Sequence, residues 1–276
     1  MTLRNGTTTT AYTSMTFRRF ALLTAGAAVA VTLSTSALAG GGNKMACNEA
    51  GPQAPRDITN TAGSNPVSFD VAPPAADMHL CDIHFHRFAE HRASGYTELA
   101  GEGDHKGYVC NGVKPATSHG EGHGTGKGCK GIAAGDTIEV HWVYTTCDVK
   151  PGPTLGSCFT DTCKAPQLRV EARVFNLTDD GSGADFAKFR TSVTGKVTLP
   201  EATDPVTYLG STTGPSYNDG SCSPFKVTWN VSSACTALEI DSINDWCGTG
   251  SNPFEEDHAH GVRKLVTDQK QLSAIN

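Results

Sequence analysis

Three histidines in two strand-like segments have the residue types of a catalytic metal site. His84 and His86 stand two residues apart in "CDIHFH", and they share one face because side chains alternate along a strand. His141, at the centre of "TIEVHWVY", can complete a set of three nitrogens if the two segments are neighbouring strands. Three neutral imidazoles leave the fourth tetrahedral position of zinc open, as in catalytic zinc sites. Co²⁺ or another divalent ion suits the same ligands.

An acidic residue stands two positions before a histidine in each segment. Asp82 precedes His84 and Glu139 precedes His141, so each carboxylate shares the face of its histidine. A carboxylate beside a ligating histidine accepts the second ring N–H and orients the ring. Because buried charge is costly unless it is paired, we expect these two acids to support the ligands.

Short strand-like runs between turn residues make up most of the chain, and helical periodicity is scarce. This pattern predicts a mainly β single domain, either a sandwich or a large twisted sheet. Short helices are expected only near residues 184–193 and 258–269. The expected strands cover residues 67–71, 78–86, 136–146, 168–177, 195–199, 206–210 and 225–231.

Residues 1–39 have the layout of a secretory signal peptide. Arg18 and Arg19 precede an apolar run over residues 20–33, and "STSALA" provides a small-residue cleavage site. An apolar run of about 14 residues is too short to cross a bilayer. We therefore expect an exported protein, periplasmic or extracellular, whose mature domain is residues 40–276 and which has no membrane attachment.

The mature chain is acidic. Residues 1–39 contain three of the 22 basic residues and none of the 28 acidic ones, so the mature net charge is −9. This charge argues against a nucleic acid or an anionic membrane surface as a partner. The sequence gives no indication of oligomeric state.

All ten cysteines follow residue 39, and an even number in an exported chain indicates disulfides. We expect that Cys158 and Cys163 do not both stay free. Residues 101–131 are rich in glycine and histidine and can bury little. They are expected to form a long surface loop, joined by a disulfide between Cys110 and Cys129.

Four short motifs, in order from Cys81 to Val231, resemble the metal core of carbonic anhydrases. They are "HFH", the "EH" of Glu90 and His91, "EVHWV", and "YLGSTTGP" with the "VTWNV" that follows it. Their order is similar to that of the alpha class. The "HFHRFAEH" context, the many cysteines and the glycine-rich insertion look more like the delta class. The resemblance implies a large, mostly antiparallel twisted sheet with few short helices.

The resemblance also implies an activity, the reversible hydration of carbon dioxide to bicarbonate and a proton by zinc-bound hydroxide. Thr212 would accept a hydrogen bond from that hydroxide, and Glu90 would orient Thr212 by accepting its hydroxyl proton. Asp82 stands where the family commonly has an amide. The zinc ligands would be His84, His86 and His141, with Glu139 behind His141.

The same resemblance implies an apolar pocket for carbon dioxide, lined by Val143, Thr213 and Trp229. Ser211 stands where an apolar pocket residue is usual in the family, so part of the wall must come from elsewhere.

Several further histidines have less specific surroundings. His105, His119 and His123 of the glycine-rich loop are the candidates for a proton shuttle. His258 and His260 form another His-x-His pair in the polar tail, which is a possible second metal site, and His91 is expected to be a structural neighbour.

Two other interpretations fit parts of the sequence. A cupin would use Glu90 as a direct metal ligand with His84 and His86, but the segment before His141 lacks the Pro-x-Gly motif that a cupin needs. An exported, non-enzymatic metal-binding protein would explain the histidine-rich loop, but not the "GSTTGP" segment.

Overall fold

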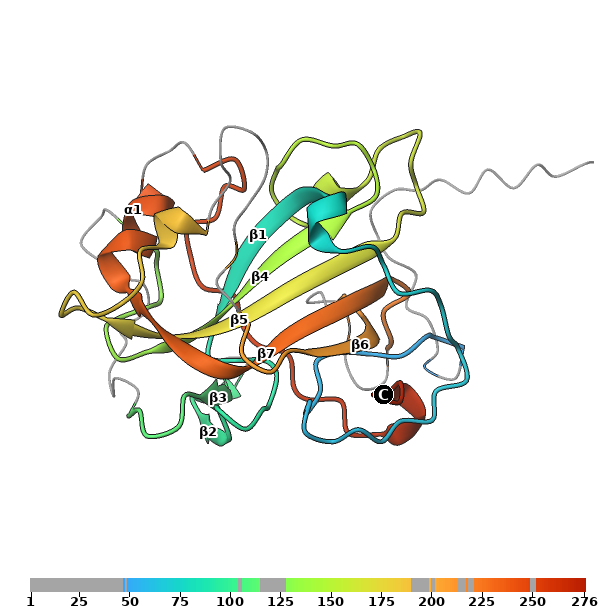
Figure 1. Ribbon diagram of the computed structural model, residues 1–276, viewed down its shortest axis with the longest axis horizontal. Coiled ribbons are helices and arrows are strands. Elements are labelled where there is room, and N and C mark those ends of the chain that lie inside the picture. The colour runs from blue at the N-terminus through green and yellow to red at the C-terminus, as the bar shows by residue number, and fades with distance from the viewer. Residues whose placement is uncertain are drawn as a thin grey trace, which may run out of the picture. The chain divides into compact units, whose positions relative to one another are not determined.

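The computed structural model describes residues 47, 49–103, 106–114, 128–189, 199, 202–212, 217, 221–248 and 252–276 (Figure 1). The expected signal peptide over residues 1–39 lies outside the described residues. So do most of the strand expected at 195–199 and four of the expected site residues, which are Thr213, His105, His119 and His123.

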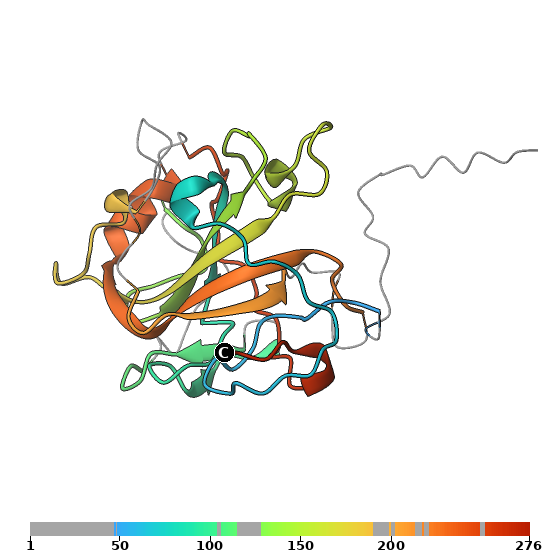
Figure 2. The same cartoon turned by 45° about the vertical axis from the view of Figure 1, so that its right-hand side comes forward.

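Five strands form one twisted sheet in the order β1-β4-β5-β7-β6 (Figures 1 and 2). Neighbouring strands are antiparallel except β5 and β7, which are parallel. The mainly β fold with a mostly antiparallel sheet is therefore confirmed, and the sheet is mixed. A parallel pair needs a long crossover connection, and residues 179–225 supply it. The strands are β1 (His79–Arg87), β4 (Thr137–Thr145), β5 (Leu168–Thr178), β6 (Val206–Ser211) and β7 (Lys226–Glu239).

Shorter elements flank this sheet. Strands β2 (Glu98–Ala100) and β3 (Gly107–Val109) pair with each other, so part of the segment expected as a loop is ordered into a small sheet. Among the described residues, no helix has the length and apolar character needed to cross a membrane. The helices are α1 (Ile240–Gly248) and the 3₁₀ turns η1 (Ala75–Asp77), η3 (Leu155–Cys158), η4 (Phe186–Lys188) and η5 (Gln269–Gln271).

Two expected elements are wrong. Residues 67–71 form no strand, and just beyond them the backbone N–H of Ala72 donates to Thr228 Oγ1 on β7. The helix expected near 258–269 is instead an irregular, partly paired segment. Its His260 N–H donates to the carbonyl of Phe85 on the free edge of β1, at 2.9 Å. This long-range pairing satisfies the backbone there without a helix.

Helix α1 was not expected, because it continues directly from β7 and is only nine residues long. Its buried residues are Ile240, Ile243 and Trp246, a three-residue spacing that indicates a helix but is too brief to stand out. The ring of Trp246 packs 4.9 Å from that of Phe186, which is in η4. The helix therefore covers one face of the sheet.

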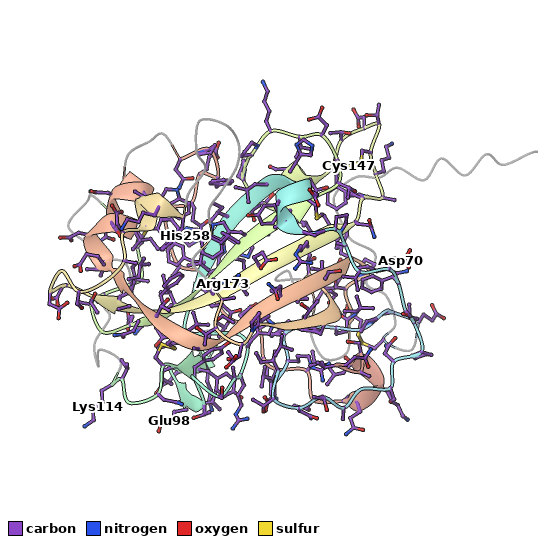
Figure 3. All side chains as sticks on the ribbon, viewed as in Figure 1. Asp70, Glu98, Lys114, Cys147, Arg173 and His258 are labelled. Carbon is purple, nitrogen blue, oxygen red and sulfur yellow. A yellow bond between two sulfur atoms is a disulfide. The ribbon has the colours of Figure 1, made fainter. Side chains whose placement is uncertain are left out.

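The sheet is buried on both faces, and strand β4 is buried along its whole length. Trp142 belongs to the apolar cluster that includes the buried residues of α1. Val143, its neighbour in sequence, belongs to a second cluster with Trp229 on the opposite face. Side chains fill both layers, whereas Asp70, Glu98 and Lys114 are exposed at the periphery (Figure 3). Adjacent residues of β4 thus face two separate cores.

Five disulfides join the described segments and use every cysteine. The expected disulfide between Cys110 and Cys129 is wrong. Cys110 instead bonds to a cysteine of β7, and Cys129 bonds to a cysteine of α1. The expectation that Cys158 and Cys163 are not both free is confirmed. Five disulfides are typical of a protein from an oxidising, exported environment. The pairs are Cys47–Cys222, Cys81–Cys158, Cys110–Cys235, Cys129–Cys247 and Cys147–Cys163.

Replacing Cys81 and Cys158 together by alanine should lower the free energy of unfolding by about 2–5 kcal/mol. Both residues are fully buried, and their bond ties edge strand β1 to η3. The matched control replaces Cys147 and Cys163 by alanine. Their disulfide closes a loop of 16 residues rather than 77, so its loss should lower the free energy of unfolding by less. Urea titrations of the oxidised proteins compare the two. An equal or larger loss in the control would contradict the prediction.

Candidate metal centre

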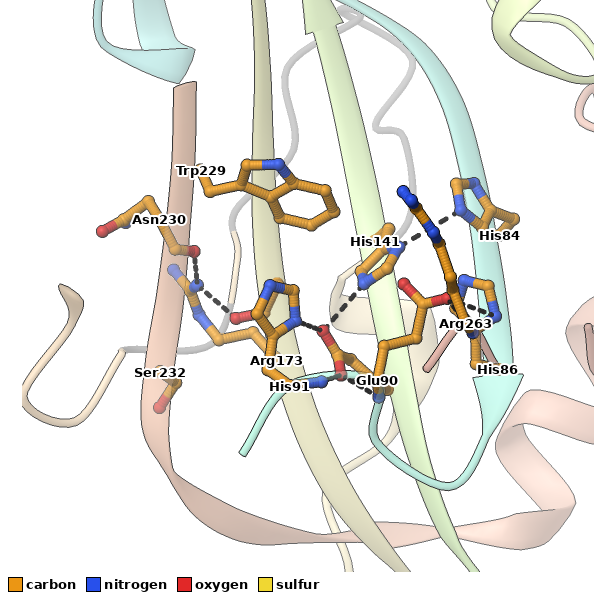
Figure 4. A network of polar contacts seen from close by, with 12 residues as sticks. His84, His86, Glu90, His91, His141, Arg173, Trp229, Asn230, Ser232 and Arg263 are labelled. Carbon is orange, nitrogen blue, oxygen red and sulfur yellow. Dashed lines mark hydrogen bonds and ion pairs between the residues drawn. The ribbon is translucent and has the colours of Figure 1, made fainter. Parts of the chain in front are cut away.

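His84, His86 and His141 converge on one face of β1 and β4 (Figure 4). His84 and His141 are directly paired across the two antiparallel strands. The three ring centroids lie 4.9–5.3 Å apart, and one nitrogen of each ring lies within 4.8 Å of the other two. The strand register therefore brings together the three residues that the sequence singled out, in a grouping that could hold a metal ion.

Hydrogen bonds on the outer side of each ring determine which nitrogen faces the other rings. His84 Nδ1 lies 2.7 Å from Asp82 Oδ2, His86 Nδ1 lies 2.8 Å from the carbonyl of Gly261, and His141 Nε2 lies 2.8 Å from Glu139 Oε1. These acceptors take a ring N–H, so the opposite nitrogens are left to bind an ion.

The inward nitrogens fit a metal. His86 Nε2 is buried and has no hydrogen-bond partner among the described residues. His84 Nε2 and His141 Nδ1 lie 3.2 Å apart. Burying the His86 nitrogen without a partner is costly. Together with the two nitrogens that share a hydrogen bond, it forms the donor set of a divalent transition metal.

Glu139 occupies the centre of the hydrogen-bond network. Its Oε2 accepts the backbone N–H groups of Glu90 (2.7 Å) and His91 (3.1 Å). Its Oε1 also lies 2.6 Å from His91 Nδ1. Opposing the effect of burial, the charge of His91 and the hydrogen bonds hold the pKa of Glu139 well below its usual value. The turn at Phe88 (φ 69°) after β1 brings these backbone groups onto the carboxylate.

His91, Glu139 and His141 also lie close enough to be considered as a second metal grouping. However, both ring nitrogens of His91 already have partners, because Nε2 lies 2.8 Å from the hydroxyl of Tyr208. The chain Tyr208–His91–Glu139–His141 is therefore a hydrogen-bonded support for His141. The sequence indicated Glu139 and a structural His91, but not Tyr208, which comes from β6.

The pKa values show where the proton lies when no ion is bound. Burial disfavours the charged form of His84, but the charge and hydrogen bond of Asp82 outweigh it and raise the pKa of His84 to about 9. Burial lowers the pKa of His141 to about 4, despite the opposing effect of Glu139. At neutral pH the proton between these rings belongs to His84, and an incoming ion must displace it.

The C-terminal segment supports His86 through the carbonyl of Gly261 and otherwise borders the site, which the sequence did not indicate. Besides Gly261, it places the ring of His260 5.7 Å from that of His84 and 5.9 Å from that of His86. Glu256 Oε1 accepts the backbone N–H of Phe85 at 3.2 Å. Two of these contacts use a backbone atom, the carbonyl of Gly261 and the N–H of Phe85, and backbone atoms leave no mark in the residue pattern.

Glu90 is buried beside the three histidines. Its Oε1 accepts the backbone N–H of Arg263 at 3.0 Å and lies 3.7 Å from His86 Nδ1. Burial, together with the charge of Glu139, raises the pKa of Glu90 to about 7. The grouping that could hold an ion contains His141 and not Glu90, which disfavours a cupin-like ligand set.

Thr212 immediately follows β6 and is buried. Within the described residues, no hydrogen bond joins its hydroxyl to Glu90, so the expected pairing stays a prediction. The neighbouring Ser211 hydroxyl donates to Gln53 Oε1 at 3.3 Å. The side chain that departs from the family pattern is thus bonded to the N-terminal segment.

Apolar side chains adjoin the histidines on the same face. Val143 is buried two residues beyond His141 on β4. The ring of Trp229 lies 5.1 Å from the ring of His141, and its indole N–H donates to the carbonyl of Ser211 at 3.0 Å. These residues could wall a small apolar pocket.

The family model of the delta carbonic anhydrases matches residues 75–242 of the chain. No curated protein gives a match. Among solved structures, the alpha carbonic anhydrase of Thermovibrio ammonificans in complex with sulfanilamide is 15% identical, with 78% of this chain and 84% of that chain covered and a TM-score of 0.33. A Chlamydomonas reinhardtii carbonic anhydrase in complex with acetazolamide is 14% identical, with coverages of 78% and 87% and a TM-score of 0.32.

The family match extends over more than half of the chain and includes both strands of the histidine site. The chain therefore belongs to the delta carbonic anhydrase family. It is a carbonic anhydrase, an enzyme whose substrates are carbon dioxide and bicarbonate, as the motifs predicted.

Asp82→Asn should flatten the pH dependence of zinc affinity. In the wild-type protein the metal must displace the proton of His84. Competition with this proton should therefore lower the zinc affinity about tenfold for each unit by which the pH falls below 9. The variant lacks the charge that raises the pKa of His84, so this dependence should largely disappear between pH 9 and 7.

Competition with a chelator at several pH values measures the slope. Asp148→Asn is the matched control, because Asp148 is exposed and lies 3.8 Å from the half-exposed His79. An unchanged slope in Asp82→Asn would show that Asp82 does not set the proton affinity of His84.

Proposed function

We propose that the protein catalyses the reversible hydration of carbon dioxide to bicarbonate and a proton, with zinc bound by His84, His86 and His141. The observation that carries this proposal is the convergence of three inward ring nitrogens, each backed by an acceptor on its outer side, in a chain of the delta family. When bound, zinc supplies the Lewis acidity that brings the pKa of a water molecule to about 7 and so provides the nucleophile.

The residues behind the histidines hold the rings in one tautomer and orientation. Asp82, Glu139 and the carbonyl of Gly261 accept the outer N–H groups, so the inward nitrogens face the ion, which has only the proton between His84 and His141 to displace. The depressed pKa of Glu139 keeps this carboxylate ionised at neutral pH. These three acceptors pre-organise the ligand set before the metal arrives.

Thr212 and Glu90 would orient the nucleophile. In this proposal the Thr212 hydroxyl accepts a hydrogen bond from the attacking oxygen and donates its own proton to Glu90. Glu90 Oε2 is buried and has no hydrogen-bond partner among the described residues, so this oxygen is available to accept the Thr212 hydroxyl proton. An acceptor of this kind fixes the direction of the hydroxyl and thereby the lone pair aimed at carbon dioxide.

Val143, Trp229 and Thr213 would form the pocket for carbon dioxide. The two described members of this set are buried next to His141, where an uncharged, apolar gas molecule can displace water. His105, His119 and His123 stay the candidates for passing the released proton to solvent.

The mature enzyme would work outside the cytoplasm. Residues 1–39 are proposed as its signal peptide, residues 40–276 as the catalytic domain, and the periplasm or the extracellular space as its location. Five disulfides and the acidic mature chain support an exported protein that binds neither nucleic acid nor an anionic membrane.

Stopped-flow mixing of the oxidised, zinc-loaded protein with carbon dioxide should show acidification far above the buffer rate. His141→Ala should abolish this activity, since two histidines cannot hold a catalytic zinc of this type. His79→Ala, at the half-exposed start of β1, is the control and should keep it. Tight zinc binding without hydration would favour the non-enzymatic alternative, and full activity in His141→Ala would reject the site.

Thr212→Val should lower kcat about 100-fold, the usual effect of removing one orienting hydrogen bond at a reacting oxygen. Thr212→Ser keeps the hydroxyl and should retain most of the activity. Thr207→Val is the control, because Thr207 is an exposed threonine of β6, the strand that Thr212 follows. Equal rates for the valine and serine variants at position 212 would remove Thr212 from the mechanism.

A further inference from the structure

A second His-x-His pair, His258 and His260, lies on the C-terminal segment. Its backbone is held from two sides: the N–H of Ala259 donates to the carbonyl of Lys130 at 2.9 Å, and the N–H of His260 donates to that of Phe85 at 2.9 Å. The two rings stand beside each other, with centroids 4.9 Å apart and an interplanar angle of 36°. The pair is therefore pre-arranged by backbone hydrogen bonds.

The ring spacing is similar to that of His84 and His86, whose centroids are 5.3 Å apart, whereas the rings of that pair are nearly perpendicular, at 82°. Each ring of the second pair also has a carboxylate on one nitrogen. Asp257 Oδ1 lies 2.6 Å from His258 Nδ1, and Glu256 Oε2 lies 3.0 Å from His260 Nε2. The other nitrogen of each ring is left to bind an ion, and the carboxylates would raise its basicity.

The local charge and exposure favour a cation from solvent. The side chains of His258 and His260 are 56% and 41% exposed. Two carboxylates contact the pair, and the one described cation among their partners is Lys130, whose Nζ lies 2.8 Å from Asp257 Oδ2. The balance around the two imidazoles is negative.

We propose that His258 and His260 bind a second divalent transition-metal ion, which is exchangeable and separate from the ion of the three-histidine centre. Imidazole nitrogens select zinc, copper or nickel over calcium and magnesium. Within the described residues no third histidine, cysteine or acid groups with the pair as a ligand, so water would complete the coordination. The second site accordingly binds its ion more weakly than the first. The two sites are close, because the ring centroids of His260 and His84 lie 5.7 Å apart.

Zinc is the probe for both sites, because a different metal ion could replace the zinc of the three-histidine centre and so confuse the count. The zinc-loaded full chain is titrated with Zn²⁺ by calorimetry, and the bound metal is counted after equilibrium dialysis. Two ions per chain are expected, the second of them weaker. His258→Ala and His260→Ala should each weaken the second ion at least tenfold and leave the first in place.

Three control variants make the result specific to this pair. His79→Ala removes a histidine of similar exposure, which also lies near an aspartate, and should keep both ions. The triple alanine variant at His105, His119 and His123 should also keep both. His141→Ala should lose the first ion and keep the second, so the proposal does not depend on the proposed function.

Three results would overturn the second site. They are a wild-type protein that binds one ion only, a second ion that persists unweakened in His258→Ala, and a second ion that is lost with the three loop histidines.

Discussion

The pairing of His84 with His141 across β1 and β4 is the constraint on which the site depends. Because side chains alternate with a period of two, a slip of one residue would turn His141 to the opposite core while His84 and His86 stayed in place. The register is held by apolar side chains on both faces of β4. The disulfide from Cys81 to η3 further anchors β1, an edge strand.

The second requirement is to keep buried polar groups paired around the histidines. Glu139 is completely buried, and such a carboxylate is tolerated because it accepts bonds from two side chains and two backbone N–H groups. Asp82 and the Gly261 carbonyl do the same for the other two rings. Of the inward nitrogens, His84 Nε2 and His141 Nδ1 are then paired with each other, and His86 Nε2 has no partner among the described residues. A divalent ion bound there would therefore stabilise the whole network.

The edge of β1 explains why the C-terminal segment matters. An edge strand exposes unpaired backbone groups, and here Glu256 and His260 cover those of Phe85. The same contacts bring Gly261 to His86 and Arg263 to Glu90. One segment thus protects the sheet, orients a metal-facing ring and carries the second histidine pair. A helix in this segment, as the sequence suggested, would have left the edge open.

The sequence by itself determined the chemistry that is local to each strand. Alternation and spacing within β1 and β4 placed Asp82 beside His84, His86 on the same face and Glu139 beside His141, because neighbours two apart on a strand must share a face. Only the tertiary structure decided the disulfide partners, the parallel pair of β5 and β7, the support of His91 by Tyr208 and the position of Gly261. These contacts join segments that are distant along the chain. Several of them use backbone atoms, which nearly every residue possesses, so the residue types in the sequence give no signal for them.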